Sequence, residues 1–111
     1  MTQPKLKTTP FDIAKYLDDE EVIAEYLSEA AADENPAVFL KAIGDVAKAR
    51  GMTGIATKSG LGRESLYKAF AAGAKPRHET VQSVLRALGM KIAIVPAAEE
   101  SVAETPRIAM A

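Results

Sequence analysis

The sequence contains no cysteine, no tryptophan and a single histidine, His78, among its 111 residues. Without cysteine the chain can form no disulfide and no thiolate metal site, and one imidazole is too few for a zinc centre. His78 also lacks the companions that nucleophilic chemistry needs, so we expect it to have a structural or surface role. The composition excludes disulfide-stabilised scaffolds and favours a reducing, cytoplasmic setting.

Long apolar runs are also lacking. No stretch approaches the roughly 20 apolar residues that cross a membrane, and the opening MTQPKLKTTP has no apolar core of a signal peptide. We therefore expect no membrane partner. Hydrophobic residues nevertheless make up 48% of the chain, which is enough for one compact core in a domain of this size.

No segment has the pattern of a catalytic, cofactor or metal site. GMTGIATKS resembles a phosphate-binding loop only superficially, because Met52 and Thr57 stand where a Walker A motif needs glycine and no strand precedes it. The neighbouring acids of residues 18–21 lie at a predicted helix start, where carboxylates normally cap the helix and meet solvent. We expect no cofactor, no metal and no enzymatic activity.

The net charge of −1 conceals a division along the chain. Residues 12–34 carry nine acids and one base, whereas residues 36–95 carry ten bases and three acids. This asymmetry indicates an acidic part that faces a cationic partner and a basic part that faces a polyanion. Solvated helix faces alone would also produce much of it, so the charge pattern leaves both interpretations open.

Apolar residues recur with helical spacing along most of the chain and predict an all-α fold of five to six short helices. A short helical segment over residues 11–17 is followed by a helix over residues 20–33 that begins with acids. Asn35 and Pro36 begin the next helix, which Gly51 ends. Four larger side chains of these segments are expected in the core: Tyr16, Tyr26, Val38 and Phe39.

The stretch GIATKSGLGRESLYKAF holds two short helical patterns that are too close together for one long helix. Thr53 can cap the first, over residues 53–59, and Gly60 supplies the left-handed conformation of a sharp turn. The second runs over residues 62–72 after Leu61, which fills the core. Two short helices joined by such a turn form a helix-turn-helix, whose second helix can enter a DNA major groove.

The second of these helices carries the side chains that we interpret as base readers, because a groove-inserted helix presents its first turns to base edges. They are Arg63, Glu64, Ser65, Tyr67 and Lys68. Residues near helix ends and in the following loop are interpreted as phosphate contacts: Thr53, Lys58, Lys75 and Arg77. The alternative is an ordinary solvated helix surface, which these residues alone do not exclude.

A final helix ends at Gly89, and the β-branched run that follows stops at Pro96 and predicts a strand. The strand comprises Met90, Lys91, Ile92, Ala93, Ile94 and Val95. Its backbone needs a partner, and no other segment of the chain has a strand pattern. We therefore predict antiparallel pairing with the same segment of a second copy, which gives a homodimer. Addition to the sheet edge of a different protein is the alternative.

These segments divide the chain into four parts. Residues 1–35 form an acidic helical segment, residues 36–89 a helix-turn-helix DNA-binding domain and residues 90–95 the dimerisation strand. The remainder, residues 96–111, is small and polar without a strong period, and we expect it to be a flexible tail.

A family resemblance rests on three runs: FDIAKYLDDEEVIAEYLSEA, AIGDVAKARGMTGIATKSGLGRESLYKAF and KPRHETVQSVLRALGM. Within them A-x-x-x-G-M-T, G-L-x-R-E-x-L-Y and T-x-x-x-V-L-x-A-L-G occur in the family's order and spacing. Over residues 11–95 the chain resembles the addiction-module antidote proteins, which are HigA-like antitoxins with a Cro/C1-type helix-turn-helix.

This resemblance implies an antitoxin of a type II toxin–antitoxin module. Such a protein neutralises a small basic toxin of the RelE/HigB type, typically a ribosome-dependent mRNA-cleaving enzyme, and represses its own operon by binding operator DNA. The acidic helix then becomes the candidate toxin contact, through Glu21, Glu25 and Glu29.

Two positions depart from the family pattern. Gly54 stands where the family usually has a glutamine that can bond a DNA phosphate, and Gly62 stands where serine usually caps the recognition helix. These departures leave open a toxin-neutralising module without DNA binding. A transcription regulator without a toxin partner is the other alternative.

Overall fold

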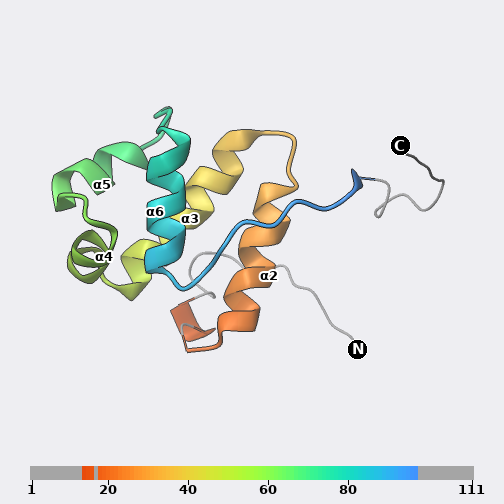
Figure 1. Cartoon of the computed structure of the whole chain (residues 1–111), viewed down its shortest axis with the longest axis horizontal. Coiled ribbons are helices and arrows are strands. Elements are labelled where there is room, and N and C mark those ends of the chain that lie inside the picture. Colours follow the sequence, from red (N-terminus) through yellow and green to blue (C-terminus); the bar gives the residue numbers. More distant parts are fainter. Residues whose placement is uncertain (1–13, 17, 98–111) are drawn as a thin grey trace.

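The computed structural model describes residues 14–16 and 18–97. A 3-10 turn, η1 (Ala14–Tyr16), precedes five α-helices: α2 (Glu20–Ala31), α3 (Pro36–Arg50), α4 (Met52–Ser59), α5 (Arg63–Ala69) and α6 (His78–Ala87). In Figure 1, α3 and α6 lie at the centre, α4 and α5 lie at one end, and α2 lies on the other side of α3. Within these ranges no helix has the length and apolarity that crossing a membrane requires.

The all-α prediction with five to six helices is confirmed for the part of the chain that the structure describes. Of the helical segment predicted over residues 11–17, only the η1 turn itself falls within that part. Helix α2 packs chiefly against α3, while α6 packs against α4 and α3. This arrangement leaves α5 at the edge of the molecule, in contact mainly with α4.

Two helices begin at residues whose side chains cap them. The Oδ1 atom of Asp19 accepts hydrogen bonds from the backbone N–H groups of Glu21 and Val22, at 3.1 and 3.2 Å. The Oδ1 atom of Asn35 likewise accepts from the N–H of Ala37 at 3.0 Å. These bonds satisfy donors that have no partner inside the helix, and they confirm the predicted starts of α2 and α3.

Replacing Asp19 with alanine should lower the free energy of unfolding by about 1 kcal/mol, because two backbone donors of α2 lose their acceptor. Glu25→Ala is the matched control, since Glu25 is exposed in the same helix and caps nothing. Chemical denaturation of both variants measures the difference. An equal loss for the two would show that Asp19 contributes only its charge.

The prediction that Thr53 caps α4 is wrong. The helix begins one residue earlier, at Met52, and its N-cap is Gly51, with φ 109° and no side-chain cap bond. Gly51 also ends α3, so one glycine in a conformation that other residues rarely adopt turns the chain between two helices. Thr53 lies exposed within α4, where its carbonyl accepts a hydrogen bond from the Thr57 hydroxyl at 3.1 Å.

Two helices are shorter than predicted, whereas the turn between α4 and α5 is as predicted. Helix α2 ends at Ala31 because the chain then turns, with the Oδ1 of Asp33 accepting from the N–H of Asn35 at 2.8 Å. Helix α5 ends at Ala69, after which Phe70 packs against the core. The left-handed conformation predicted for Gly60 is confirmed by its φ of 79°.

The core is apolar throughout. Seven side chains are at most 1% exposed: Ile23, Ile43, Val46, Ala47, Leu66, Val84 and Leu88. No polar or charged residue of the described ranges is buried. Leu66 is the one fully buried residue of α5 and Ala69 is half-buried, so the remaining side chains of this helix face solvent or a partner.

Two of the four side chains predicted for the core lie elsewhere. Tyr26 and Phe39 pack against the core as predicted. Tyr16 is 44% exposed and lines a surface depression, and Val38 is 38% exposed. Val38 belongs to the apolar stripe of α3 by spacing, but it lies in the first turn, where it lines an open groove between α2 and α3.

The segment predicted as a strand has no regular secondary structure, and the described residues contain no strand. The N–H of Met90 donates to the carbonyl of Leu85 at 2.8 Å, and the following residues make no further backbone bond within the described chain. Ile94 is 92% exposed and Val95 61%. The strand is therefore not confirmed, and its pairing between chains stays a prediction. The tail beyond residue 97 lies outside the described residues.

Candidate functional site

Helix α5 brings the five predicted base-reading side chains together on one exposed surface. Arg63, Glu64, Ser65, Tyr67 and Lys68 are all exposed, on either side of the buried Leu66. The carbonyl of Gly62 accepts the first helical bond, from the N–H of Leu66 at 3.0 Å, without any side-chain cap. The helix is therefore positioned by packing, and its outer face is polar and available. Contact with bases stays a prediction.

Arg63 and Tyr67 interact with each other along this face. The guanidinium carbon of Arg63 lies 5.4 Å from the centre of the Tyr67 ring, within the range of a cation–π contact. The two residues are four apart in the sequence, so they are neighbours on one helix face. Tyr67 is 43% exposed, so its ring forms a surface platform over which the Arg63 guanidinium lies.

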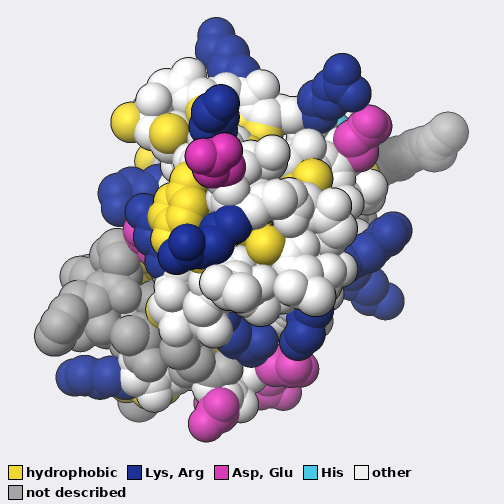
Figure 2. All heavy atoms as spheres, turned by 90° about the vertical axis from the view of Figure 1, so that its left-hand side faces the viewer, with side chains coloured by type: hydrophobic (Ala, Val, Ile, Leu, Met, Phe, Trp, Pro, Cys, Tyr) yellow, Lys and Arg dark blue, Asp and Glu magenta, His cyan; other side chains and the backbone are white. Residues whose placement is uncertain are grey.

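Basic side chains extend from α5 over the surrounding surface. Figure 2 views the end of the molecule at which α4 and α5 lie, and Lys and Arg side chains are spread across it. The predicted phosphate contacts lie in α4 and in the loop between α5 and α6, and all are exposed: Thr53, Lys58, Lys75 and Arg77. Arg77 has only a loose ion pair with Glu79, with N and O atoms 3.7 Å apart and both side chains more than 70% exposed. Solvent screens such a pair, so it does not prevent Arg77 from reaching an anion.

Helix α2 carries the predicted toxin-contact residues on one ridge. Glu21, Glu25 and Glu29 are exposed and four residues apart, which places them on the same side of the helix. We call these three side chains the acidic ridge. None of them takes part in an ion pair of the described residues, and the sequence of α2 contains no base. Figure 1 shows α2 and α5 on different sides of α3, so the acidic and the basic surfaces are separate.

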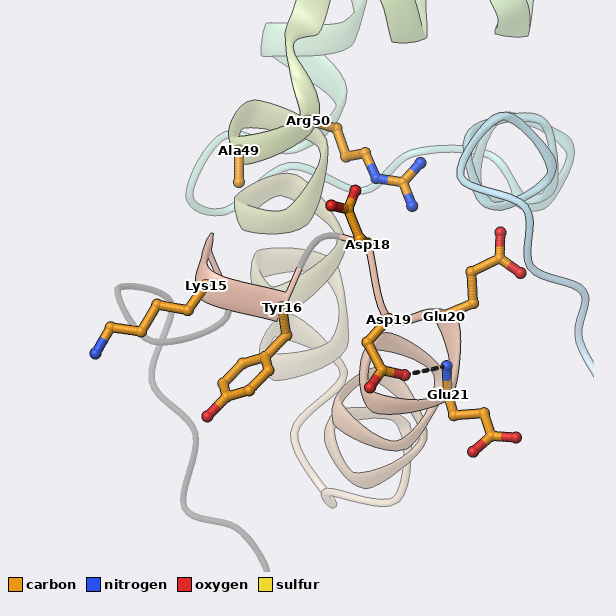
Figure 3. Close-up of a pocket in the computed structure, with 8 residues that line it drawn as sticks. All are labelled: Lys15, Tyr16, Asp18, Asp19, Glu20, Glu21, Ala49 and Arg50. Carbon is orange, nitrogen blue, oxygen red and sulfur yellow. Dashed lines mark hydrogen bonds between the residues drawn. The ribbon is translucent and has the colours of Figure 1, made fainter.

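A broad depression lies where η1, the start of α2 and the end of α3 meet. Figure 3 shows its lining, in which the side chains of Asp18 and Arg50 point toward one another and Glu20 points away from the cap at Asp19. The adjacent acids do not converge. Among the described residues no group of three or more carboxylate or histidine side chains could hold a metal ion. His78 is exposed at the start of α6.

A second hollow is the groove between α2 and α3, which sequence reasoning missed. It is lined by Tyr26, Glu29, Ala30, Asp33, Val38, Lys41, Ala42 and Asp45. Burial raises the pKa of the Tyr26 phenol above its ordinary value of 10.0, and the negative charge of Asp45 raises it further. The phenol therefore stays protonated at neutral pH and can donate a hydrogen bond. A signal for the groove was present in the sequence, since alanine at positions 30 and 42 leaves space between the two helices.

Comparison with known proteins gives one family. A family model described as "Probable addiction module antidote protein" matches residues 7–96. An uncharacterized protein of Haemophilus influenzae is 40% identical over 84 residues, which cover 76% of this chain and 87% of that protein. No solved structure matches the chain. The matched region includes α2 to α6 and the segment that follows them.

Proposed function

Because the chain belongs to the family of probable addiction module antidote proteins, we propose that it is a type II antitoxin that neutralises a small basic RelE/HigB-like toxin and represses its own operon. The antitoxin role follows from the family. The proposal adds the kind of toxin and sequence-specific DNA binding, and it places the protein in the cytoplasm, where the operon is. Its role is binding, and it requires no catalytic chemistry.

One observation carries the DNA-binding part. Helices α4 and α5 are short, are joined by the three residues 60–62, and α5 exposes everything except Leu66 and the half-buried Ala69. A helix that is fixed by its inner side and polar on its outer side can lie in the major groove while the preceding helix meets the backbone, as in a helix-turn-helix of the Cro/C1 type. The basic surroundings of α5 supply the phosphate contacts that such docking needs.

Fluorescence anisotropy with the DNA upstream of the gene tests this part. We expect tighter binding than to a scrambled duplex of equal length, with an affinity that falls steeply as salt rises, because neutralised phosphates release their counterions. Equal affinity for the two duplexes would contradict operator recognition.

A second candidate function, toxin neutralisation without DNA binding, is favoured by one feature of α4. Gly54 is exposed and has no side chain to offer a phosphate, although an added Cβ would meet no atom within 4 Å. A protein that suppresses toxicity of the adjacent gene product but does not distinguish its upstream DNA would have this function. Absence of a short, basic reading frame beside the gene would instead favour a regulator without a toxin.

Toxin association should depend on the acidic ridge. Replacing Glu21, Glu25 and Glu29 with glutamine should slow association with the toxin and flatten its salt dependence, because exposed complementary charges act mainly on the encounter rate. Stopped-flow mixing at several salt concentrations measures both effects. Glu64→Gln on α5 is the control, and an association rate unchanged by the triple replacement would contradict the role of the ridge.

A further inference from the structure

The groove between α2 and α3 has an apolar floor that none of the described residues covers. Its volume is about 450 Å³, and Ala30, Ala42 and Val38 contribute its apolar surface. Val38 is one of the few large hydrophobic side chains of the described residues that stay exposed, at 38%. Covering such a surface with an apolar side chain is favourable, because apolar area is removed from water.

The rim of the groove carries more acidic side chains than its one basic side chain, Lys41, can neutralise. Lys41 forms an ion pair with Asp45, at 2.9 Å between Nζ and Oδ2, so these two charges neutralise each other. Glu29 and Asp33 remain, and no ion pair of the described residues includes either. The groove thus combines an apolar floor with two carboxylates that lack a cation.

The same carboxylates continue the acidic ridge. Residues 21, 25, 29 and 33 are all acidic and spaced by four, so like charges follow one another along α2 and past its end. Like charges at this spacing destabilise a helix, and acids near its C-terminus oppose the helix dipole. A cation supplied from outside would relieve both effects at once.

We propose that the α2–α3 groove is where the toxin docks, through a basic segment that places an apolar side chain on Val38 and Lys or Arg side chains against Glu29 and Asp33. This inference rests on the antitoxin role proposed above. A nucleic acid is a poor occupant, because the rim would repel its phosphates. One wall of the groove, α2, lies on the other side of α3 from α5, so the docked segment would leave the DNA-binding surface uncovered.

Val38→Lys tests the groove with a closely matched control, Ala37→Lys. Both residues are exposed in the first turn of α3, but only Val38 lines the groove. Both variants add the same charge near the same helix end. The probe is the purified product of the reading frame adjacent to this gene, and surface plasmon resonance gives its association and dissociation rates.

We expect Val38→Lys to weaken binding at least about 30-fold, mainly through faster dissociation, and Ala37→Lys to weaken it less than about 3-fold. Equal effects of the two variants, or an unchanged dissociation rate for Val38→Lys, would overturn the proposal. If the wild-type protein neither binds the probe nor suppresses its toxicity, the antitoxin role itself fails, which is a different result.

A photo-crosslinking amino acid at position 38 or 37 provides a measurement that does not depend on affinity. Crosslinks to the toxin from position 38 and far fewer from position 37 support the groove. Crosslinks from position 38 only to a second copy of the chain would overturn it, since the occupant would then be the protein itself. Near-UV and far-UV circular dichroism of each variant shows that it is folded before the rates are compared.

Discussion

Replacing Arg63 with alanine is expected to weaken operator binding by about 1–3 kcal/mol in each half-site, because a bidentate contact between arginine and guanine contributes that much discrimination. An operator with two half-sites would lose about twice this, roughly 2–6 kcal/mol. The loss should relax preference at one base position of each half-site and leave binding to random DNA almost unchanged. Anisotropy titrations against single-base variants of the upstream DNA measure both quantities.

Lys58→Ala is the control that distinguishes a base contact from a phosphate contact. Lys58 is exposed in the last turn of α4, and a phosphate contact there should weaken all sequences alike and reduce the salt dependence. If Arg63→Ala also lowered cognate and random binding equally, Arg63 would be a phosphate contact and the base-reading role would be wrong.

The ring of Tyr67 adds a second test on the same helix. Tyr67→Phe keeps the ring beneath Arg63 and should keep operator preference, whereas Tyr67→Ala removes the platform and should reduce preference more than general affinity. If both variants lost preference equally, the phenol oxygen itself would be the important group, as a direct contact of Tyr67 with DNA requires.

Features that depend on neighbouring residues could be predicted from the sequence. The start of α3 at Asn35 and the left-handed turn at Gly60 follow from local hydrogen bonding and backbone sterics, and the structure confirms both. The exposed face of α5 also follows locally, because a short helix that buries Leu66 must turn its other side outward. The failure at Thr53 has a local cause too: Gly51 ends one helix and begins the next, a double role that separate start and stop signals do not describe.

Features that depend on how helices pack could not be predicted. Spacing assigns Val38 to the buried stripe of α3, but its exposure is decided by where α2 ends and by the small residues that face it. Tyr16 is exposed for a similar reason, since η1 lies at the rim of a depression and not over the core. The α2–α3 groove therefore became visible only in the structure, although every residue that lines it is in the sequence.

The segment that follows α6 gives the last prediction. Residues 91–95 make no backbone hydrogen bond within the described chain, and Ile94 and Val95 are exposed. Antiparallel pairing with the same segment of a second copy would satisfy these groups and place two α5 helices about a two-fold axis. Helix-turn-helix dimers read half-sites about 34–36 Å apart. Pairing of the two segments would therefore give the backbone groups hydrogen-bond partners and also match the two-fold symmetry of an operator.

Ile92→Pro should convert the dimer to a monomer and abolish binding to a two-half-site operator, because proline removes a donor from the ladder. The N–H of Ile92 has no backbone acceptor among the described residues, so the fold of the monomer should not change. Ala97→Pro, outside the segment, is the control and should remain dimeric.

Sedimentation of the wild-type protein at tens of micromolar without toxin distinguishes the homodimer from pairing with the toxin. A monomeric wild-type protein would contradict the homodimer and favour the alternative, in which this segment adds to the edge of the toxin's sheet, because the unpaired backbone would then find its partner only in the complex.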